Sequence, residues 1–317
     1  METFYVCLTM DCENSDYWKS PGGWDMSPHA IRGFVDTLSD HGMKGNLFVV
    51  LENARRNPEA IHHAKEKGFE ISLHIHTEEG GFTMGGKAVA PGQRWLTDFS
   101  YDEQVQILSQ ACDSWSRALG FRPMTFRAGC FCGNEDTYKA LIKVGFKYGN
   151  IGGGQRNYPT YRSFWVGAPL HPYCPSEEDK LKEGRMPFLE IPCTYNPGKK
   201  TANVISHGES LVELRMGLGD TLMHMETIDA AIEYQIENGV KLKTVVSLTH
   251  DRFPYDDPNS AMHERLIAVA EYIKRAVEHK GHRWVPATFA DIHDAFLKSA
   301  GAKRAGAPGD GGQKREA

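Results

Sequence analysis

Short apolar segments rich in β-branched residues alternate with longer amphipathic segments along most of this 317-residue chain. Repeated strand–helix alternation favours an α/β fold with a mostly parallel sheet, either open or closed into a barrel. Strands are predicted at residues 4–9, 45–50, 70–76, 125–127, 148–151, 163–166, 189–192 and 244–250. Helices are predicted at residues 28–41, with Ser27 as the cap, and at 57–67, 102–119, 135–143, 210–238 (continuous or broken), 259–280 and 288–297.

The composition is that of an ordinary water-soluble protein, with 40% hydrophobic and 24% charged residues and a net charge of -5. Lys and Arg form no cluster, so no nucleic-acid partner is expected. No apolar stretch is long enough to span a bilayer, and the first ten residues lack the features of a signal peptide. The seven cysteines are odd in number and scattered, which indicates reduced thiols and a cytoplasmic protein. The sequence does not indicate the oligomeric state.

Two long irregular segments, 78–100 and 167–187, interrupt the alternation. Loops of this length inside a compact domain are usually functional or disordered, and we expect both to wall a substrate cleft. They carry Trp95 and Tyr173, whose aromatic faces suit a sugar ring, although such residues as often anchor a loop. The small, polar, glycine-rich segment 301–317 is predicted to be a disordered tail.

Acidic residues and histidines stand at the predicted ends of two strands. Asp11 and Glu13 share a face of the first strand and repel each other unless a cation or an arginine neutralises them. An acidic strand end in solvent is the alternative. His74 and His76 also share a face, and two imidazoles with a carboxylate form a ligand set that zinc favours. Glu78 is a further oxygen ligand or simply the first loop residue.

An arginine and a histidine stand at two further strand ends. Arg127 needs an anionic partner because its guanidinium stays charged, and Asp11 is the natural candidate, although a purely structural salt bridge would explain it equally well. His250 can exchange a proton near neutral pH, and Asp251 or another carboxylate could hold its tautomer; a surface histidine at a turn is the alternative. All four clusters lie at predicted carboxyl ends of strands, where α/β sheets and barrels place their sites.

The motif order T-M-D-C-E, L-H-I-H, F-R-A-G and L-T-H-D resembles the polysaccharide deacetylase family, also called the NodB-homology or carbohydrate esterase 4 type. The resemblance spans residues 4–297, nearly the whole chain ahead of the tail. It implies an irregular (β/α)7-type barrel over residues 1–300 that binds one divalent metal ion, commonly zinc.

The resemblance also implies a role for each motif residue. Asp11 would be the catalytic base, Arg127 would orient it, and His250 would be the general acid. A backbone N–H in the turn that includes Gly129 would help to hold the oxyanion. The metal ligands would be Glu13, His74 and His76.

The chain departs from the common family pattern in three motifs. Cys12 stands where an adjacent aspartate is common, and the third motif lacks the frequent proline. Glu78 occupies the position four residues after His74 where a second histidine is common, which makes His76 the expected second ligand. These differences indicate a divergent branch, so the usual chitin and peptidoglycan substrates do not transfer to this chain.

The implied function is a metal-dependent hydrolase that removes an acetyl or formyl group from an N- or O-acylated sugar or glycan precursor. Two alternatives remain: an amidohydrolase that opens a non-sugar amide, such as a cyclic imide or ureide, and a barrel that has lost catalysis and binds a glycan. Asp11, Arg127 and His250 are all present, which argues against the inactive barrel. The sequence does not determine the substrate, the acyl group or the metal.

Overall fold

Eight parallel strands form a curled sheet in the computed structural model, which describes residues 1–13, 22–77, 82–84, 87–88, 95–203 and 207–305. Along the sheet the strand order is β10-β7-β6-β3-β2-β1-β13, and β14 pairs with the start of β1. All of these pairs are parallel, which confirms the expected parallel α/β fold. The strands are β1 (Thr3–Cys12), β2 (Gly45–Val49), β3 (Glu70–Ile75), β6 (Thr125–Ala128), β7 (Tyr148–Asn150), β10 (Leu189–Glu190), β13 (Lys243–His250) and β14 (Arg283–Pro286).

The two edges of this sheet, β10 and β13, are joined by irregular backbone rather than by direct pairing. After β10, the amide of Thr194 donates to the carbonyl of Val246 in β13 at 2.8 Å. On the same strand the amide of Leu248 donates to the carbonyl of Leu214 at 2.9 Å. The sheet therefore curls into the irregular barrel that we expected, with this seam between its edges.

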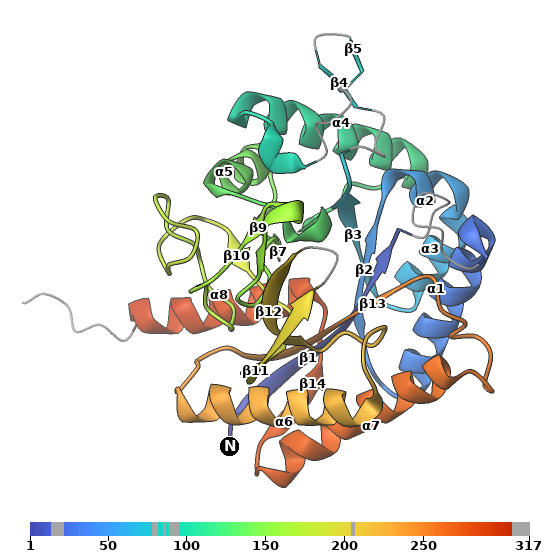
Figure 1. Cartoon of the computed structure of the whole chain (residues 1–317), viewed down its shortest axis with the longest axis vertical. Helices are drawn as coiled ribbons and strands as arrows, with labels where there is room; N and C mark the ends of the chain where they lie inside the picture. Colours follow the sequence, from blue (N-terminus) through green and yellow to red (C-terminus); the bar gives the residue numbers. More distant parts are fainter. Residues whose placement is uncertain (14–21, 78–81, 85–86, 89–94, 204–206, 306–317) are drawn as a thin grey trace, which may run out of the picture.

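Helices cover the outer face of the sheet (Figure 1). Around the barrel α6 packs on α7, α7 on α1, α1 on α3, α2 on α4 and α4 on α5. None of the helices in the described ranges combines the length and the apolar character needed to cross a bilayer. The helices are α1 (Gly23–Asp40), α2 (Leu51–Arg56), α3 (Pro58–Glu66), α4 (Tyr101–Leu119), α5 (Glu135–Val144), α6 (Thr221–Glu237), α7 (Ala261–His279) and α8 (Phe289–Ala305).

Alternation along the strands separates two hydrophobic cores. Val6 and Leu8 of β1 point outward into the core beneath the helices, whereas Cys7 between them points into the barrel. The barrel interior is filled from below by the first turn of α8, where Phe289 packs edge-to-face on Phe48 with ring centroids 5.4 Å apart. The lower end of the barrel is thus closed, and a site can open only at the carboxyl ends of the strands.

The expected helix over residues 210–238 is wrong in its first part. The chain there forms an antiparallel hairpin of β11 (Tyr195–Asn203) and β12 (Gly208–Glu213), and α6 begins only at Thr221. Asp220 caps this helix by accepting a hydrogen bond from the amide of Met223 at 2.8 Å. Two short strands, β8 (Asn157–Tyr158) and β9 (Ser163–Phe164), extend the hairpin into a four-stranded sheet.

Three smaller boundaries also differ from the prediction. Ser27 is not the cap of α1, because the helix begins at Gly23 and Ser27 lies buried inside it. Helix α8 continues to Ala305, five residues beyond the expected domain limit at 300, and residues 306–317 lie outside the described ranges. A short antiparallel pair, β4 (Thr83–Met84) and β5 (Lys87–Ala88), lies within the first long loop.

Candidate active site

The strand register brings the sequence motifs to one level at the carboxyl ends of the strands. Asp11 of β1 lies beside His250 of β13, and His74 of β3 lies beside Arg127 of β6. Paired residues of neighbouring strands face the same side of the sheet. Asp11 is linked through Phe48 of β2 to Ser72, two residues before His74, so all four side chains point into the barrel. The structure therefore assembles residues that are up to 239 positions apart in the sequence (11 to 250).

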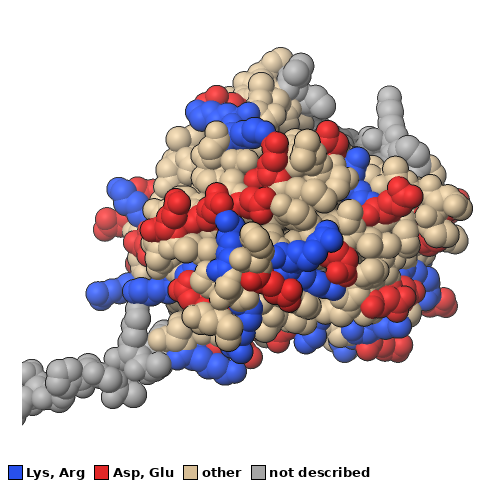
Figure 2. Space-filling view, turned by 90° about the horizontal axis from the view of Figure 1, so that it is seen from below, with Lys and Arg blue, Asp and Glu red and all other residues tan. Residues whose placement is uncertain are grey.

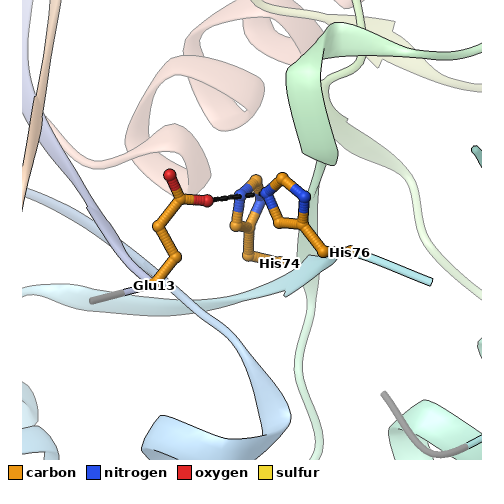
Figure 3. A group of neighbouring side chains, drawn as sticks. All are labelled: Glu13, His74 and His76. Atoms are coloured by element: carbon orange, nitrogen blue, oxygen red, sulfur yellow. Dashed lines mark hydrogen bonds and ion pairs between the residues drawn. The ribbon is translucent and has the colours of Figure 1, made fainter. Parts of the chain in front are cut away.

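Glu13, His74 and His76 converge on one point. The carboxylate oxygen Oε2 of Glu13 lies 2.9 Å from Nε2 of His74 and 2.6 Å from Nε2 of His76. One ligand atom from each residue falls within 4.8 Å of the others, and both imidazoles face the same carboxylate (Figure 3). Both histidines are almost fully buried, and Glu13 keeps only 13% of its side chain exposed. This is the spacing of a three-ligand metal centre.

The hydrogen bonds of His74 fit a cation at this point. Its Nδ1 lies 3.0 Å from the backbone carbonyl of Arg127, which can only accept, so Nδ1 carries the proton. In a neutral imidazole the other nitrogen, Nε2, then turns a lone pair toward the carboxylate of Glu13. Two facing electron pairs repel unless a proton or a metal ion lies between them. An Nδ1–H donated to a backbone carbonyl is also the usual support of a metal-binding histidine.

Asp11 forms a buried ion pair with Arg127, as the sequence predicted. The Nη1 of Arg127 donates to Oδ1 of Asp11 at 2.5 Å, and Arg127 is fully buried. Thr9 and Asn150 also accept hydrogen bonds from it at 3.0 Å, and its guanidinium lies over the ring of Phe48. Burial lowers the pKa of Arg127, but Asp11, Cys193 and Glu213 together outweigh burial and raise the pKa. Asp11 is consequently held in one orientation beside a permanent positive charge.

His250 contacts Glu13 rather than the neighbouring aspartate. Its Nε2 lies 3.3 Å from Oε1 of Glu13, and burial lowers the pKa of this imidazole despite that carboxylate. Asp251 instead accepts hydrogen bonds from Ser27 at 2.5 Å, from Asn53 at 2.8 Å and from the amide of Glu13 at 3.0 Å. Of the two expected alternatives, Asp251 or another carboxylate, the structure places another carboxylate, Glu13, beside His250, and Asp251 fixes the backbone of Glu13.

A cavity of about 730 Å³ opens above these residues. Asp11, Glu13 and His250 form part of its floor, and the β11–β12 hairpin forms a wall. The sequence analysis missed this wall, because it assigned residues 210–213 to a helix. Other lining residues are Cys130, Phe131, Arg156, Tyr158, Tyr161, Glu213, Arg215, Leu218, Met223 and Arg252.

None of the three residues expected to contact substrate, Trp95, Gly129 and Tyr173, is among the described residues that line the cavity. Tyr173 is buried, and its hydroxyl donates to the carbonyl of Lys180 at 2.8 Å, so this residue anchors its loop. Trp95 is also buried and packs edge-to-face on Tyr161, which does line the cavity, with ring centroids 5.6 Å apart. Trp95 therefore supports a residue that lines the cavity. Glu78, the other ligand considered for the metal, lies outside the described residues.

Gly129 occupies a tight position beside the metal-binding group. A Cβ at this residue would lie 2.5 Å from the carbonyl oxygen of Ile75 and 3.1 Å from the ring of His76. The next two residues, Cys130 and Phe131, have φ of 53° and 55°, and both line the cavity. The absence of a side chain at Gly129 thus lets this turn approach His76.

Glu213 bridges two arginines in the cavity wall. It accepts hydrogen bonds from Arg156 at 3.0 Å and from Arg215 at 2.7 Å. Burial alone would raise the pKa of Glu213, but the two guanidiniums lower it from 4.5 to about 2. A carboxylate whose folded pKa is depressed stabilises the fold fully above its unfolded pKa, and this stabilisation is lost as the pH falls through the folded pKa.

We expect Glu213→Gln to lower the free energy of unfolding by about 3 kcal/mol at pH 7, since a shift of one pKa unit corresponds to about 1.4 kcal/mol. The difference from the wild type should shrink as the pH falls from about 4.5 to about 2. Denaturant unfolding across this pH range measures it. Glu209→Gln, at an exposed ion pair of the same strand, is the matched control and should change stability by less than about 1 kcal/mol. A pH-independent difference at Glu213 would contradict the ion-pair explanation.

Comparison with known proteins agrees with this architecture. The polysaccharide deacetylase family model matches residues 22–149, a range that holds His74, His76 and Arg127. A protein from Mycobacterium smegmatis assigned as a polysaccharide deacetylase is 17% identical, with a TM-score of 0.59 over 100% of this chain and 95% of that one. A protein from Parabacteroides distasonis assigned as a glycoside hydrolase/deacetylase is 15% identical, with a TM-score of 0.63 over 94% of this chain and 71% of that one.

PuuE allantoinase has the same fold, with 14% identity and a TM-score of 0.57 over 94% of this chain and 90% of that one. No curated protein matches the chain. At these identities the solved structures establish the fold, a NodB-like curled parallel barrel, and leave the reaction open.

Proposed function

Because this chain is a distant member of the polysaccharide deacetylase family, we propose that it is a metal-dependent hydrolase that removes an acetyl or formyl group from an N- or O-acylated sugar or glycan precursor. The observation that carries this proposal is the convergence of Glu13, His74 and His76 on one point beside the Asp11–Arg127 ion pair. A three-ligand cation site next to an ionised carboxylate is what hydrolysis by an activated water requires.

The proposed centre would hold one divalent ion, and its ligands of two imidazoles and one carboxylate favour zinc. When bound, such an ion supplies Lewis-acid activation of the acyl carbonyl and of the attacking water. Asp251 keeps Glu13 in place through its amide, and the carbonyl of Arg127 keeps His74 in the tautomer that a metal needs.

The remaining steps belong to the protein's own groups. Asp11 accepts the proton of the attacking water, and Arg127 keeps it ionised and oriented. Backbone N–H groups of the turn Gly129–Phe131, which borders the cavity, stabilise the developing oxyanion. His250 donates a proton to the leaving amine or alcohol.

We also propose a reducing, cytoplasmic location for the protein. All seven cysteines are free, and burial raises the pKa of the thiol in each of the five that lie in the interior. Thiols of this kind persist in a reducing compartment.

Metal analysis together with acyl release tests the proposed function. The purified chain should contain nearly one divalent ion, and His74→Ala should reduce both this content and the release of acetate or formate from a panel of acylated sugars. His29→Ala, an exposed histidine in a surface ion pair, is the control and should behave like the wild type. A fully active protein without metal would contradict the proposal.

A cyclic ureide and a cyclic imide belong in the same panel. This chain shares its fold with PuuE allantoinase. The proposed metal centre would have the same ligands whether the substrate is a sugar amide or a ring amide. Ring opening without acyl release would show that the substrate is a cyclic amide and not an acylated sugar. Metal binding with neither reaction would favour a binding protein.

A further inference from the structure

Charged side chains away from the metal-binding group give the cavity a positive character. Arg156, Arg215 and Arg252 line it, and Glu213 is the one carboxylate of the described lining that lies among them. Figure 2 shows that acidic and basic residues are interspersed on one face of the described exterior, and the whole chain carries a charge of -5. The positive balance is therefore a local property of the cavity, whose walls focus the field. The other two lining carboxylates are Asp11, which pairs with Arg127, and Glu13, which belongs to the metal-binding group.

Arg215 is fixed in place but has unused hydrogen-bonding capacity. Its Nε donates to Glu213, whose two oxygens also accept from Arg156. One carboxylate is thus shared by two arginines, and it neutralises only one of them. Arg215 keeps 19% of its side chain exposed and lines the cavity, so its terminal nitrogens are available to a ligand.

Arg252 is a second cation beside the reacting groups. It lines the cavity, is partly exposed, and forms no ion pair with any carboxylate of the described ranges. It follows His250 by two residues at the end of β13, and Arg215 forms a β-bridge with Leu248 of the same strand. Both cations therefore lie on the side of the cavity where His250 would protonate the leaving group.

We propose that Arg215 and Arg252 form a carboxylate-binding subsite, so that the substrate is an acylated compound with an acidic group on its leaving-group portion. This inference rests on the proposed function for the reaction and adds the substrate's charge. The guanidinium fork matches a planar carboxylate, and Glu213 offsets the charge of only one of the three arginines in the lining. Glu213 positions this subsite, because it holds Arg215 against the wall.

Direct binding tests the subsite independently of catalysis. Isothermal titration of the purified full chain would compare N-acetylglucosaminuronate with N-acetylglucosamine, which share a ring and an acetamide and differ in the charge at carbon 6. We expect the acid to bind at least about tenfold more tightly, since a charge-assisted hydrogen bond is worth that much. Arg252→Gln should remove the preference, and Arg252→Lys should restore part of it. Arg275→Gln, at an exposed position of α7, should keep it.

Each alternative outcome has a defined meaning. Equal binding of the two sugars, or binding of neither, overturns the subsite. A preference that survives Arg252→Gln overturns it too, because the acid would then bind elsewhere, for instance at the metal. Tighter binding of N-acetylglucosamine 6-phosphate than of the uronate would show that the subsite binds a phosphate and not a carboxylate. Acetate release, measured on the same compounds, reports separately on the hydrolase: a charge preference without release rejects the reaction and keeps the subsite.

Discussion

Replacing Asp11 with Asn should lower kcat by about 10²- to 10⁴-fold and leave the bound metal in place. The amide has the shape of the carboxylate and can still accept the hydrogen bond from Arg127, but it cannot take a proton from water. Glu13, His74 and His76 are untouched by this change, so the metal content should stay that of the wild type. Steady-state kinetics and elemental analysis of the same preparation measure the two quantities.

The loss of charge at Asp11 has a second consequence. Arg127 is fully buried, and Asp11 is the anion that pairs with it, so the variant leaves a buried charge unpaired. Breaking a pair of this kind costs about 3–5 kcal/mol of stability. The kinetics must therefore be measured below the melting temperature of the variant. Asp36→Asn, which removes a carboxylate from an exposed ion pair of α1, controls for a change of net charge. Wild-type turnover by the Asp11 variant would remove Asp11 as the base.

The site motifs could be found from the sequence because each lies at the end of a strand with a clear alternating pattern. In β1 the outward Val6 and Leu8 define the pleat, and this fixes Asp11 and Glu13 on the inner face. The pairing of Arg127 with Asp11 followed from the rule that a buried guanidinium needs an anion, and the structure confirms this pair.

The cavity wall could not be found in the same way. Residues 208–213 have a short apolar run that suits a helix as well as a strand, and the choice depends on pairing with β11. Glu213 and Arg215 were therefore not recognised as neighbours of the site. Tyr173 shows a related difficulty: an aromatic residue in a long loop binds a ligand or anchors the loop, and only the buried hydrogen bond to Lys180 distinguishes the two.

Asp251 and His250 have different roles although they are adjacent along the chain. Consecutive residues of an extended chain point in opposite directions. Asp251 consequently turns toward Ser27 and Asn53 behind the sheet, while His250 turns into the barrel. Sequence proximity suggested contact between the two, and strand geometry separates them.

His76 is the expected second histidine ligand of the metal centre. His76→Ala should weaken binding of the divalent ion by more than about 100-fold, because loss of a direct ligand exceeds the 10- to 100-fold effect of losing a supporting residue. Turnover should fall with the metal. The physical reason is the 2.6 Å approach of His76 Nε2 to the oxygen of Glu13 that also faces His74, which makes His76 one of three converging ligand atoms.

Glu78→Ala is the informative comparison, since Glu78, four residues after His74, is the other ligand that the sequence offered. It should retain wild-type affinity if His76 is the ligand. His29→Ala, at the surface, controls for the removal of an imidazole. Metal affinities from competition with a chelator of known strength separate the three variants. If the Glu78 variant loses the ion while the His76 variant keeps it, the third metal ligand is Glu78 and not His76. The close contact of His76 with Glu13 would then be an ordinary hydrogen bond.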